Sequence, residues 1–189
     1  MVTWTNMTDG HSASGTTLIK DSSSNNWTAD ATSSTTWTAA TQTADVEFTV
    51  SHSSMDYFCG FDLIANLDSY NMDYAMYLGG SGDINIYENG SQVSGGVSTY
   101  TNSDTLKVSM ASDGTVTYYK NDSLIYTSST TASGEYRVNA VVYSAGRTLT
   151  ATLTTSGSGG GSGGEESTPI EGESSLIEHI LYLNTVVPK

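Results

Sequence analysis

The sequence has little of what stabilises small secreted domains or crosses membranes. Its 189 residues include one cysteine, two prolines and no apolar run near the roughly 18 residues of a membrane span. A single cysteine, Cys59, excludes an internal disulfide framework, so the fold must be stabilised by packing. We expect Cys59 to be a buried free thiol, because no basic residue near it in the sequence would lower its pKa.

Basic residues are scarce. Six lysines and arginines face twenty aspartates and glutamates, which gives a net charge of −14. Proteins that bind nucleic acids neutralise phosphates with clustered Lys and Arg, so this balance argues against a nucleic-acid partner. Anionic membranes are disfavoured for the same reason, and we expect no membrane partner.

Patterns typical of catalysis are also missing. The alternating carboxylates of glycan-cleaving sandwich enzymes do not occur, and Asp56 and Asp62, six residues apart, are interpreted as solvated acids at strand ends rather than a catalytic pair. His11, His52 and His179 are scattered and have no cysteine or carboxylate at the spacing of a zinc site. The sequence therefore predicts a protein without enzymatic activity.

The residues that are present, alternating apolar side chains separated by frequent turn residues, are typical of an all-β protein. Ser, Thr, Gly, Asn and Tyr dominate the first 155 residues, and apolar side chains alternate with polar ones in segments such as "ADVEFTVS" and "DYFCGFDLI". Tight turns are predicted at 79–82, 89–90, 113–114 and 121–122, where Gly, Asn and Asp favour positive φ angles. Strands are expected at 2–5, 15–20, 44–51, 56–64, 72–79, 83–88, 105–110, 114–120, 123–127, 135–143 and 147–154.

These segments predict a two-sheet antiparallel jelly-roll sandwich of about 11 strands over residues 1–155. A linker of Gly, Ser and acidic residues is expected at 156–174, and a C-terminal anchoring or oligomerisation segment at 175–189.

Three stretches carry a resemblance to a known group. "MDYAMYLGGSGDINIYENG" (72–90), "TLKVSMASDGTVTYYKNDSLIYTSS" (105–129) and "YRVNAVVYSAGRTLT" (136–150) resemble concanavalin A-like jelly-roll modules of bacterial surface proteins and phage fibres, which share their architecture with lectins, laminin-G and SPRY domains. The resemblance covers roughly residues 2–155. It implies the sandwich fold, but its motifs are turns and core strands and define no ligand site.

Candidate ligand-binding residues are aromatic rings in polar surroundings, because such rings stack on sugar faces while Asn, Asp and Ser meet the hydroxyls. Each aromatic has a structural alternative, as the plug of a sandwich edge or as an ordinary strand residue. The candidates are Trp27, Trp37, Asp68, Tyr70 and Asn71.

A structural calcium ion is a further hypothesis. The segment "NLDSYNMD" (66–73) offers side-chain oxygens of the kind that Ca²⁺ prefers, with Asn66, Asp68 and Asp73 as candidate ligands. Asn and Asp also build turns without any ion, and the spacing is not that of an EF-hand.

The C-terminal segment differs from everything before it. After Ser175, which forms a capping box with Glu178, apolar residues recur at helical spacing and predict a short amphipathic helix, with a short strand as the alternative. A helix of about twelve residues is marginal alone in water, so its apolar stripe needs a cover. We expect these residues to contact a protein partner or another copy of the chain: Leu176, Ile177, Ile180, Leu181, Leu183 and Val187.

Together these features favour a binding or adhesion module for a glycan or surface ligand. The first ten residues show no secretion signal, which together with the acidic, Ser- and Thr-rich composition suits display on a phage virion. Display at a bacterial cell surface, on a secreted adhesin, is the neighbouring interpretation. The alternatives are a purely structural decoration or filament subunit, and a carrier domain with an engineered tethered peptide.

Overall fold

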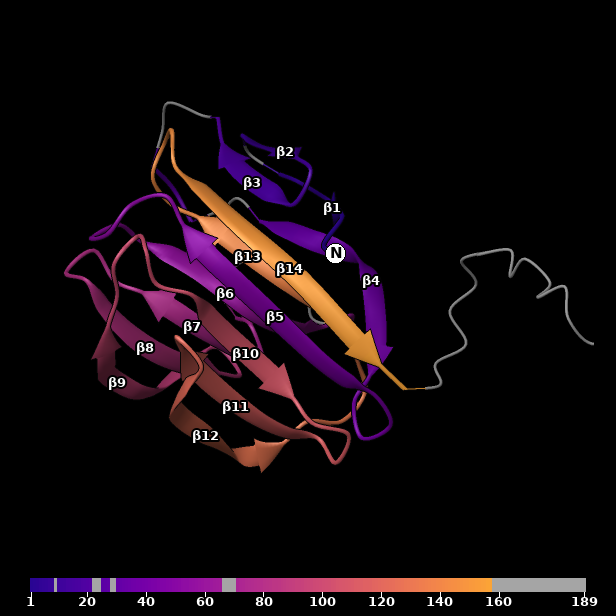
Figure 1. Cartoon of the computed structure of the whole chain (residues 1–189). Helices are drawn as coiled ribbons and strands as arrows, with labels where there is room; N and C mark the ends of the chain where they lie inside the picture. The colour runs from indigo at the N-terminus through magenta and orange to yellow at the C-terminus, as the bar shows by residue number, and fades with distance from the viewer. Residues whose placement is uncertain (9, 22–24, 28–29, 66–70, 158–189) are drawn as a thin grey trace, which may run out of the picture. The chain divides into compact units, whose positions relative to one another are not determined.

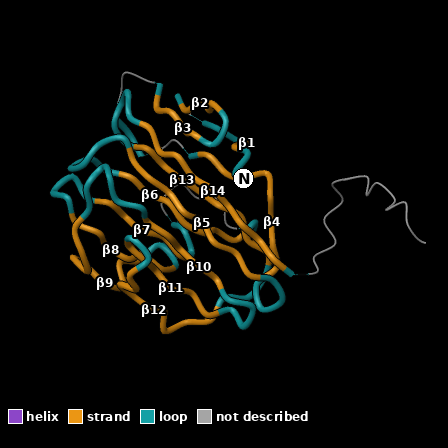
Figure 2. The backbone as a smooth tube through the Cα atoms, in the orientation of Figure 1, coloured by secondary structure: helices purple, strands orange, loops and turns teal. Residues whose placement is uncertain are grey.

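Strands and turns make up the described part of the chain. The computed structural model describes residues 1–157 except residue 9 and residues 22–24, 28–29 and 66–70. Within these ranges there is no helix, as Figure 2 shows, and therefore none long and apolar enough to cross a membrane. These residues belong to one unit, Met1–Gly159.

Fourteen strands form two antiparallel sheets of seven. Sheet A has the spatial order β1 (Trp4–Thr5), β4 (Ala31–Thr38), β13 (Glu135–Val142), β6 (Tyr57–Leu63), β7 (Tyr74–Leu78), β8 (Asp83–Glu88) and β9 (Ser91–Thr99). Sheet B has the order β12 (Ser123–Thr131), β11 (Thr115–Lys120), β10 (Leu106–Met110), β5 (Thr43–Val50), β14 (Thr148–Ser156), β3 (Thr17–Lys20) and β2 (His11–Ser14). In Figure 1 sheet B lies in front of sheet A.

The core lies between the sheets and is built from alternate residues. On β6 the inward side chains are Tyr57, Cys59 and Phe61, and on β5 they are Val46, Phe48 and Val50, all buried in one cluster. The predicted inward residues of both strands are confirmed, but only β5 has one buried face, because the other face of β6 is buried as well. Cys59 is free and buried, as expected, and burial raises the pKa of its thiol.

Predicted turns also appear where the sequence places them. Asn89 and Gly90 have φ angles of 48° and 71° and join β8 to β9 in a two-residue hairpin, and Asn121 and Asp122, at 46° and 60°, join β11 to β12. Both geometries need left-handed residues, which Asn, Asp and Gly tolerate best.

Three strands were not predicted: β2, β4 and β9. Their sequences, "HSAS", "ATSSTTWT" and "SQVSGGVST", are rich in small polar residues and lack the alternation that marks the other strands. Backbone pairing with neighbouring strands holds them in place, since β4 pairs with both β1 and β13.

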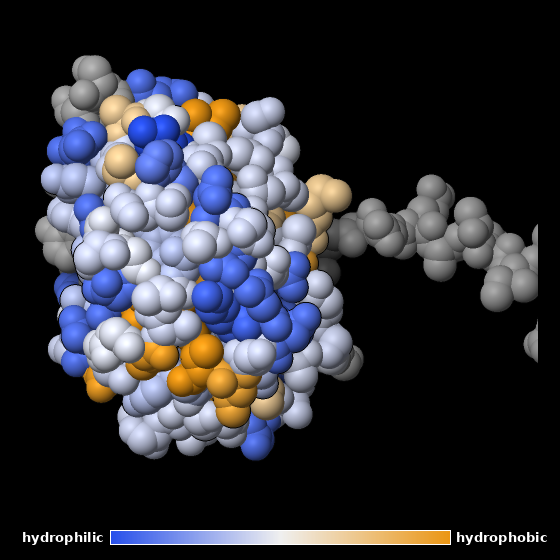
Figure 3. All heavy atoms as spheres, turned by 60° about the vertical axis from the view of Figure 1, so that its left-hand side comes forward, coloured by the Kyte–Doolittle hydropathy of each residue, from blue (hydrophilic) through white to orange (hydrophobic). Residues whose placement is uncertain are grey.

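Strands β9 and β12 lie at one end of the strand order in their sheets. Figure 3 shows the side of the molecule that these edges occupy; its surface is mostly hydrophilic, with hydrophobic atoms gathered in a small band. Val93 on β9 and Leu124 on β12 are among the few large apolar side chains exposed in the described ranges. Most large apolar side chains of the described ranges are instead buried, either between the two sheets or on the outer face of sheet A.

Candidate ligand-binding site

Sheet A has aromatic side chains on its outer face as well as its inner one. Phe58 on β6 and Tyr77 on β7 face each other in register, and Tyr87 lies on the neighbouring strand β8. These positions alternate with the inward-facing core residues, so they point away from the core. A sheet that faces water usually carries polar residues there, so the aromatic residues mark this face as unusual.

The outward rings pack into one group with Trp27, which comes from the segment between β3 and β4. Phe58 stacks on Tyr77 with ring centroids 4.9 Å apart, and meets Tyr87 edge-on at 5.1 Å and Trp27 edge-on at 5.8 Å. Such edge-to-face contacts hold the rings in fixed relative orientations. Phe58 is 6% exposed, whereas Trp27, Tyr77 and Tyr87 are only half-buried.

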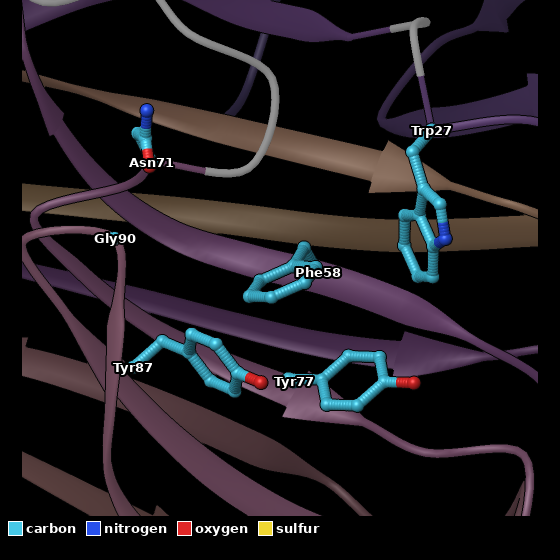
Figure 4. A pocket seen from close by; sticks show the side chains of 6 residues that line it. All are labelled: Trp27, Phe58, Asn71, Tyr77, Tyr87 and Gly90. Atoms are coloured by element: carbon cyan, nitrogen blue, oxygen red, sulfur yellow. The ribbon is translucent and has the colours of Figure 1, made fainter.

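These rings border a hollow of about 380 Å³, which we call the aromatic hollow; its lining residues are Trp27, Phe58, Asn71, Tyr77, Tyr87 and Gly90. Figure 4 shows Phe58 between Trp27 and Tyr87, with Asn71 and Gly90 at the end of the hollow away from Trp27. The hollow therefore has an aromatic floor and walls and a polar end. Its volume suits one small ligand or one unit of a polymer.

The polar end is shaped by the hairpin turn between β8 and β9. The backbone N–H of Gly90 donates to the carbonyl of Met72 at 3.2 Å, and that of Asn89 donates to the carbonyl of Asp73 at 3.1 Å. A side chain at position 90 would place its Cβ 2.2 Å from Oδ1 of Asn71. A larger residue here would therefore force the Asn71 side chain to move, and glycine also suits the positive φ.

Trp27 is held from its other side. Nζ of the buried Lys20 donates to Oδ1 of Asn26 at 2.8 Å, and the N–H of Asn26 donates to the carbonyl of Tyr143 at 3.3 Å. The Tyr143 ring lies 4.5 Å from the Trp27 ring between centroids. These contacts anchor the residue that precedes Trp27 and support one face of its indole.

A carboxylate lies beside the hollow. Asp56 Oδ1 accepts a hydrogen bond from the Tyr77 hydroxyl at 2.7 Å and another from the Gly80 N–H at 2.8 Å. Burial and the bond to Asp56 both raise the pKa of Tyr77, so its hydroxyl stays protonated and acts as a donor to Asp56.

A second polar group lies farther along the same face and is fully covered. Asp62 on β6 is 0% exposed and Asp73, just before β7, is 4% exposed. Asp62 Oδ2 accepts from Nδ2 of Asn139 at 3.0 Å, and Asp73 Oδ2 accepts from the Leu63 N–H at 2.8 Å. Burial raises the pKa of Asp62 to about 8, against the hydrogen bond from Asn139 and together with the neighbouring Asp73 carboxyl.

Of the residues predicted to bind a ligand, Trp27 and Asn71 lie in the aromatic hollow. Asp68 and Tyr70 lie outside the described residues. The prediction that Trp37 offers an exposed ring is wrong. It lies on β4, is 1% exposed, and its Nε1 donates to Met110 Sδ at 3.3 Å in the interior, so it is a core residue.

Of the three candidate calcium ligands, only Asp73 lies within the described residues. Asn66 and Asp68 lie outside the described residues, and Asp73 is buried with one carboxylate oxygen bonded to backbone. Within the described ranges no three His, Cys, Asp or Glu side chains form a metal-binding group. A structural calcium at residues 66–73 stays a prediction. The predicted interface residues between Leu176 and Val187 also lie outside the described part of the chain.

The interpretation of Asp56 and Asp62 as solvated acids is wrong for Asp62, which is fully buried. The two carboxyls stand at opposite ends of β6, six residues or roughly 20 Å apart along the strand. Paired carboxylates of glycoside hydrolases stand about 5 to 9.5 Å apart. These two residues therefore do not form such a pair.

Sequence reasoning missed Phe58, Tyr77 and Tyr87. All three lie in strands that were predicted, at the positions that alternate with the core residues. A signal was available in the sequence: in 57–61 the residues that face either side of the strand are all apolar or small, whereas in β5 apolar residues alternate with polar ones. A strand with two apolar phases is covered on both faces.

No protein-family description and no curated protein matches the chain. Solved structures with a similar fold include the PSpry domain of TRIM65, with a TM-score of 0.59 and 12% identity over 76% of this chain and 83% of that one. The carbohydrate-binding module CBM66 from Bacillus subtilis has a TM-score of 0.55 and 16% identity over 82% and 96% of the two chains.

The carbohydrate recognition domain of Emp47p has a TM-score of 0.55 and 12% identity over 82% and 88% of the two chains. At these identities the likeness concerns the fold alone. It agrees with the two seven-stranded antiparallel sheets, so the chain has a concanavalin A-like jelly-roll fold.

Proposed function

We propose that the chain is a non-enzymatic binding module whose aromatic hollow takes a glycan. The observation that carries this proposal is the group of rings on the outer face of sheet A, which borders a hollow of about 380 Å³ instead of being closed over. Aromatic faces pack against the C–H faces of sugar rings, and hydroxyl and amide groups at the border bond to sugar hydroxyls.

The polar groups of the hollow suit a ligand that is rich in hydroxyls. The Tyr87 hydroxyl donates to Gln92 Oε1 at 3.3 Å and keeps its lone pairs for an incoming donor. Within the described ranges Nε1 of Trp27 makes no hydrogen bond and is a donor for a ligand. The fold gives general support, because two solved structures with this fold are a carbohydrate-binding module and a carbohydrate recognition domain.

The test is a glycan array probed with the native chain and two variants. Trp27→Ala removes one wall of the hollow, and Thr152→Ala removes an exposed side chain on the outer face of sheet B. Binding that Trp27→Ala abolishes and Thr152→Ala preserves supports the proposal. Silence across a broad array, with all three proteins folded, contradicts it and favours a purely structural subunit.

We also propose that the module is displayed on a phage virion or at a bacterial cell surface, where a glycan receptor would be met. Residues 175–189 would then attach it to a larger assembly or to its own copies, through the apolar stripe of that segment. Sedimentation of the chain with and without residues 165–189 tests this attachment. An unchanged mass and unchanged partner binding after deletion would exclude it.

A further inference from the structure

The aromatic hollow contains no positive charge. None of its six lining residues is Lys, Arg or His. Two of the five Lys and Arg side chains of the described ranges are paired with acids in sheet B: Lys107 bonds Asp122 at 2.9 Å, and Lys120 lies 3.3 Å from Asp104. A carboxylate, sulfate or phosphate on a ligand would find no cation in the lining.

Among the strands of sheet A, the one basic residue lies beside the buried polar group. Arg137 on β13 pairs in register with Asp62, and Val141 on the same strand pairs with Phe58. Four residues of strand separate Arg137 from the Phe58 row, or about 13 Å. Lys20 is fully buried and its Nζ donates to Asn26, so it acts in holding the Trp27 segment.

Asp56 gives the hollow a negative neighbour. Both hydrogen bonds that its side chain accepts, from Tyr77 and Gly80, end on Oδ1. Within the described ranges Oδ2 of Asp56 has no hydrogen-bond partner. Because Asp56 is only half-buried, a ligand can reach this side chain. A carboxylate oxygen of this kind is a strong acceptor for an N–H donor, and strongest for a charged one.

The aromatic rings add to the same preference. Phe58, Tyr77, Tyr87 and Trp27 present ring faces and edges around one space, and the face of each ring is electron-rich. An ammonium group over such faces gains a cation–π interaction, which is larger where water is excluded. Four rings, one adjacent carboxylate and no cation in the lining all favour a positive ligand.

We propose that the glycan bound in the aromatic hollow carries a protonated amino group, which lies against the rings and bonds to Asp56. This inference rests on the proposed glycan-binding function and narrows its ligand to cationic sugars, such as units with a free 2-amino group. N-acetylated sugars of the same length lack the charge, and acidic sugars are repelled by Asp56.

The experiment compares oligosaccharides of β-1,4-linked glucosamine with N-acetylglucosamine oligosaccharides of the same length by isothermal titration calorimetry. It is performed at a pH where the amine is protonated and at physiological salt, so that the net charge of −14 attracts the cation weakly from a distance. We expect the aminated ligand to bind about tenfold more tightly than the acetylated one.

Two variants with the same change in net charge separate specific from general attraction. Asp56→Asn should remove most of this preference, because it removes the carboxylate beside the hollow while keeping an acceptor for Tyr77. Asp45→Asn, which removes a carboxylate from the outer face of sheet B, should keep it. Equal effects of the two variants would overturn the inference and show attraction by net charge alone.

The other outcomes are also decisive. If acetylated and aminated ligands bind equally well and both lose affinity in Trp27→Ala, the glycan function stands and the charge preference is refuted. If no oligosaccharide binds but choline chloride does, with loss in Trp27→Ala, the hollow recognises ammonium groups and the glycan function fails. If none of these ligands binds, both proposals fail.

Discussion

The outer faces of the two sheets differ, although the sheets have the same number of strands and share one core. On sheet B the outward positions of β5 and β14 are threonines, Asp45 and Glu47, half-buried or exposed to solvent. On sheet A the outward positions of β6 and β7 are Phe58, Gly60, Asp62, Ala75 and Tyr77, and all of them except Tyr77 are buried. Sheet B follows the usual rule of apolar inside and polar outside, and sheet A departs from it.

The apolar outer face of sheet A is the part of the molecule where we expect a binding function. A sheet needs only one apolar face to form the sandwich, so the second apolar face of sheet A is not explained by the core. Part of it is covered by chain, such as Met72, which packs in the same outer cluster as Phe58. The part that is left uncovered is the aromatic hollow.

The largest expected effect is on stability. Phe58→Ala removes the ring at the centre of the outer aromatic group and should lower the free energy of unfolding by about 3 kcal/mol. Thr152→Ala, on the bare outer face of sheet B, should change it by less than about 0.5 kcal/mol. Urea denaturation of both variants checks this. Similar small losses in the two would mean that the outer group of sheet A contributes no packing.

Next comes an effect on binding rather than on folding. Trp27→Ala should weaken glycan binding at least tenfold, because it removes one wall of the hollow, and should cost only about 1 kcal/mol of stability, since Trp27 is half-buried. Trp37→Phe should do the reverse, lowering stability while leaving affinity unchanged, because Trp37 lies in the core. Calorimetric titration together with thermal unfolding distinguishes the two variants.

Two glycines provide a smaller and more local test. Gly90→Ala and Gly96→Ala both force alanine into positive φ, at 71° and 61°, and each should cost about 1 kcal/mol for that reason. Only at position 90 would the new Cβ collide with Asn71, whereas position 96 has open space. Gly90→Ala should therefore lose additional stability and reduce affinity. Identical behaviour of the two variants would show that Asn71 does not shape the site.

Stability should also depend on pH, through Asp62 on sheet A and His11 on sheet B. Asp62 ionises near its ordinary pKa of 3.8 when unfolded and near 8 when folded, so its stabilising contribution is full below about pH 3.8 and falls as pH rises toward 8. Burial and the nearby Lys20 charge lower the pKa of His11 from 6.5 to about 4, so its contribution is lost as pH falls between those values.

Above pH 6.5, therefore, Asp62 is the one of these two groups that still changes its charge with folding. Asp62→Asn should remove the decline in stability between pH 6.5 and 8, measured by urea denaturation at successive pH values. Asp45→Asn, on sheet B, should retain the decline. A slope that persists in Asp62→Asn would show that another group causes it.

Sequence reasoning predicted the architecture better than the site because the two depend on different signals. Alternation identified the inward residues of β5, β6 and β7, and the pairs Asn89-Gly90 and Asn121-Asp122 identified two hairpins. Strand β4 escaped because its Ser and Thr residues show no alternation, and Trp37 was therefore placed in a loop instead of the core. Strands of this kind are set by pairing with neighbours, which a local pattern does not contain.

The aromatic hollow depends on a meeting of distant segments. Trp27, Asn71 and Gly90 come from three separate connections, and only the sheet order brings them to the same rings of β6, β7 and β8. Trp27 and Asn71 were recognised as residue types suited to sugars. That the same ligand would also touch Phe58 and Tyr87 follows from the strand register, which the sequence alone did not reveal.

The most direct test uses the indole N–H signals of the three tryptophans, followed by ¹H–¹⁵N NMR during titration with a glycan that binds. Trp4 Nε1 donates to the Thr16 carbonyl at 3.0 Å and Trp37 Nε1 donates to Met110, so both are internal controls in the sandwich, whereas Trp27 lies in the hollow. We expect a saturable shift of the Trp27 signal, whereas those of Trp4 and Trp37 should stay in place. Saturable glycan binding that leaves the Trp27 signal unmoved would contradict it.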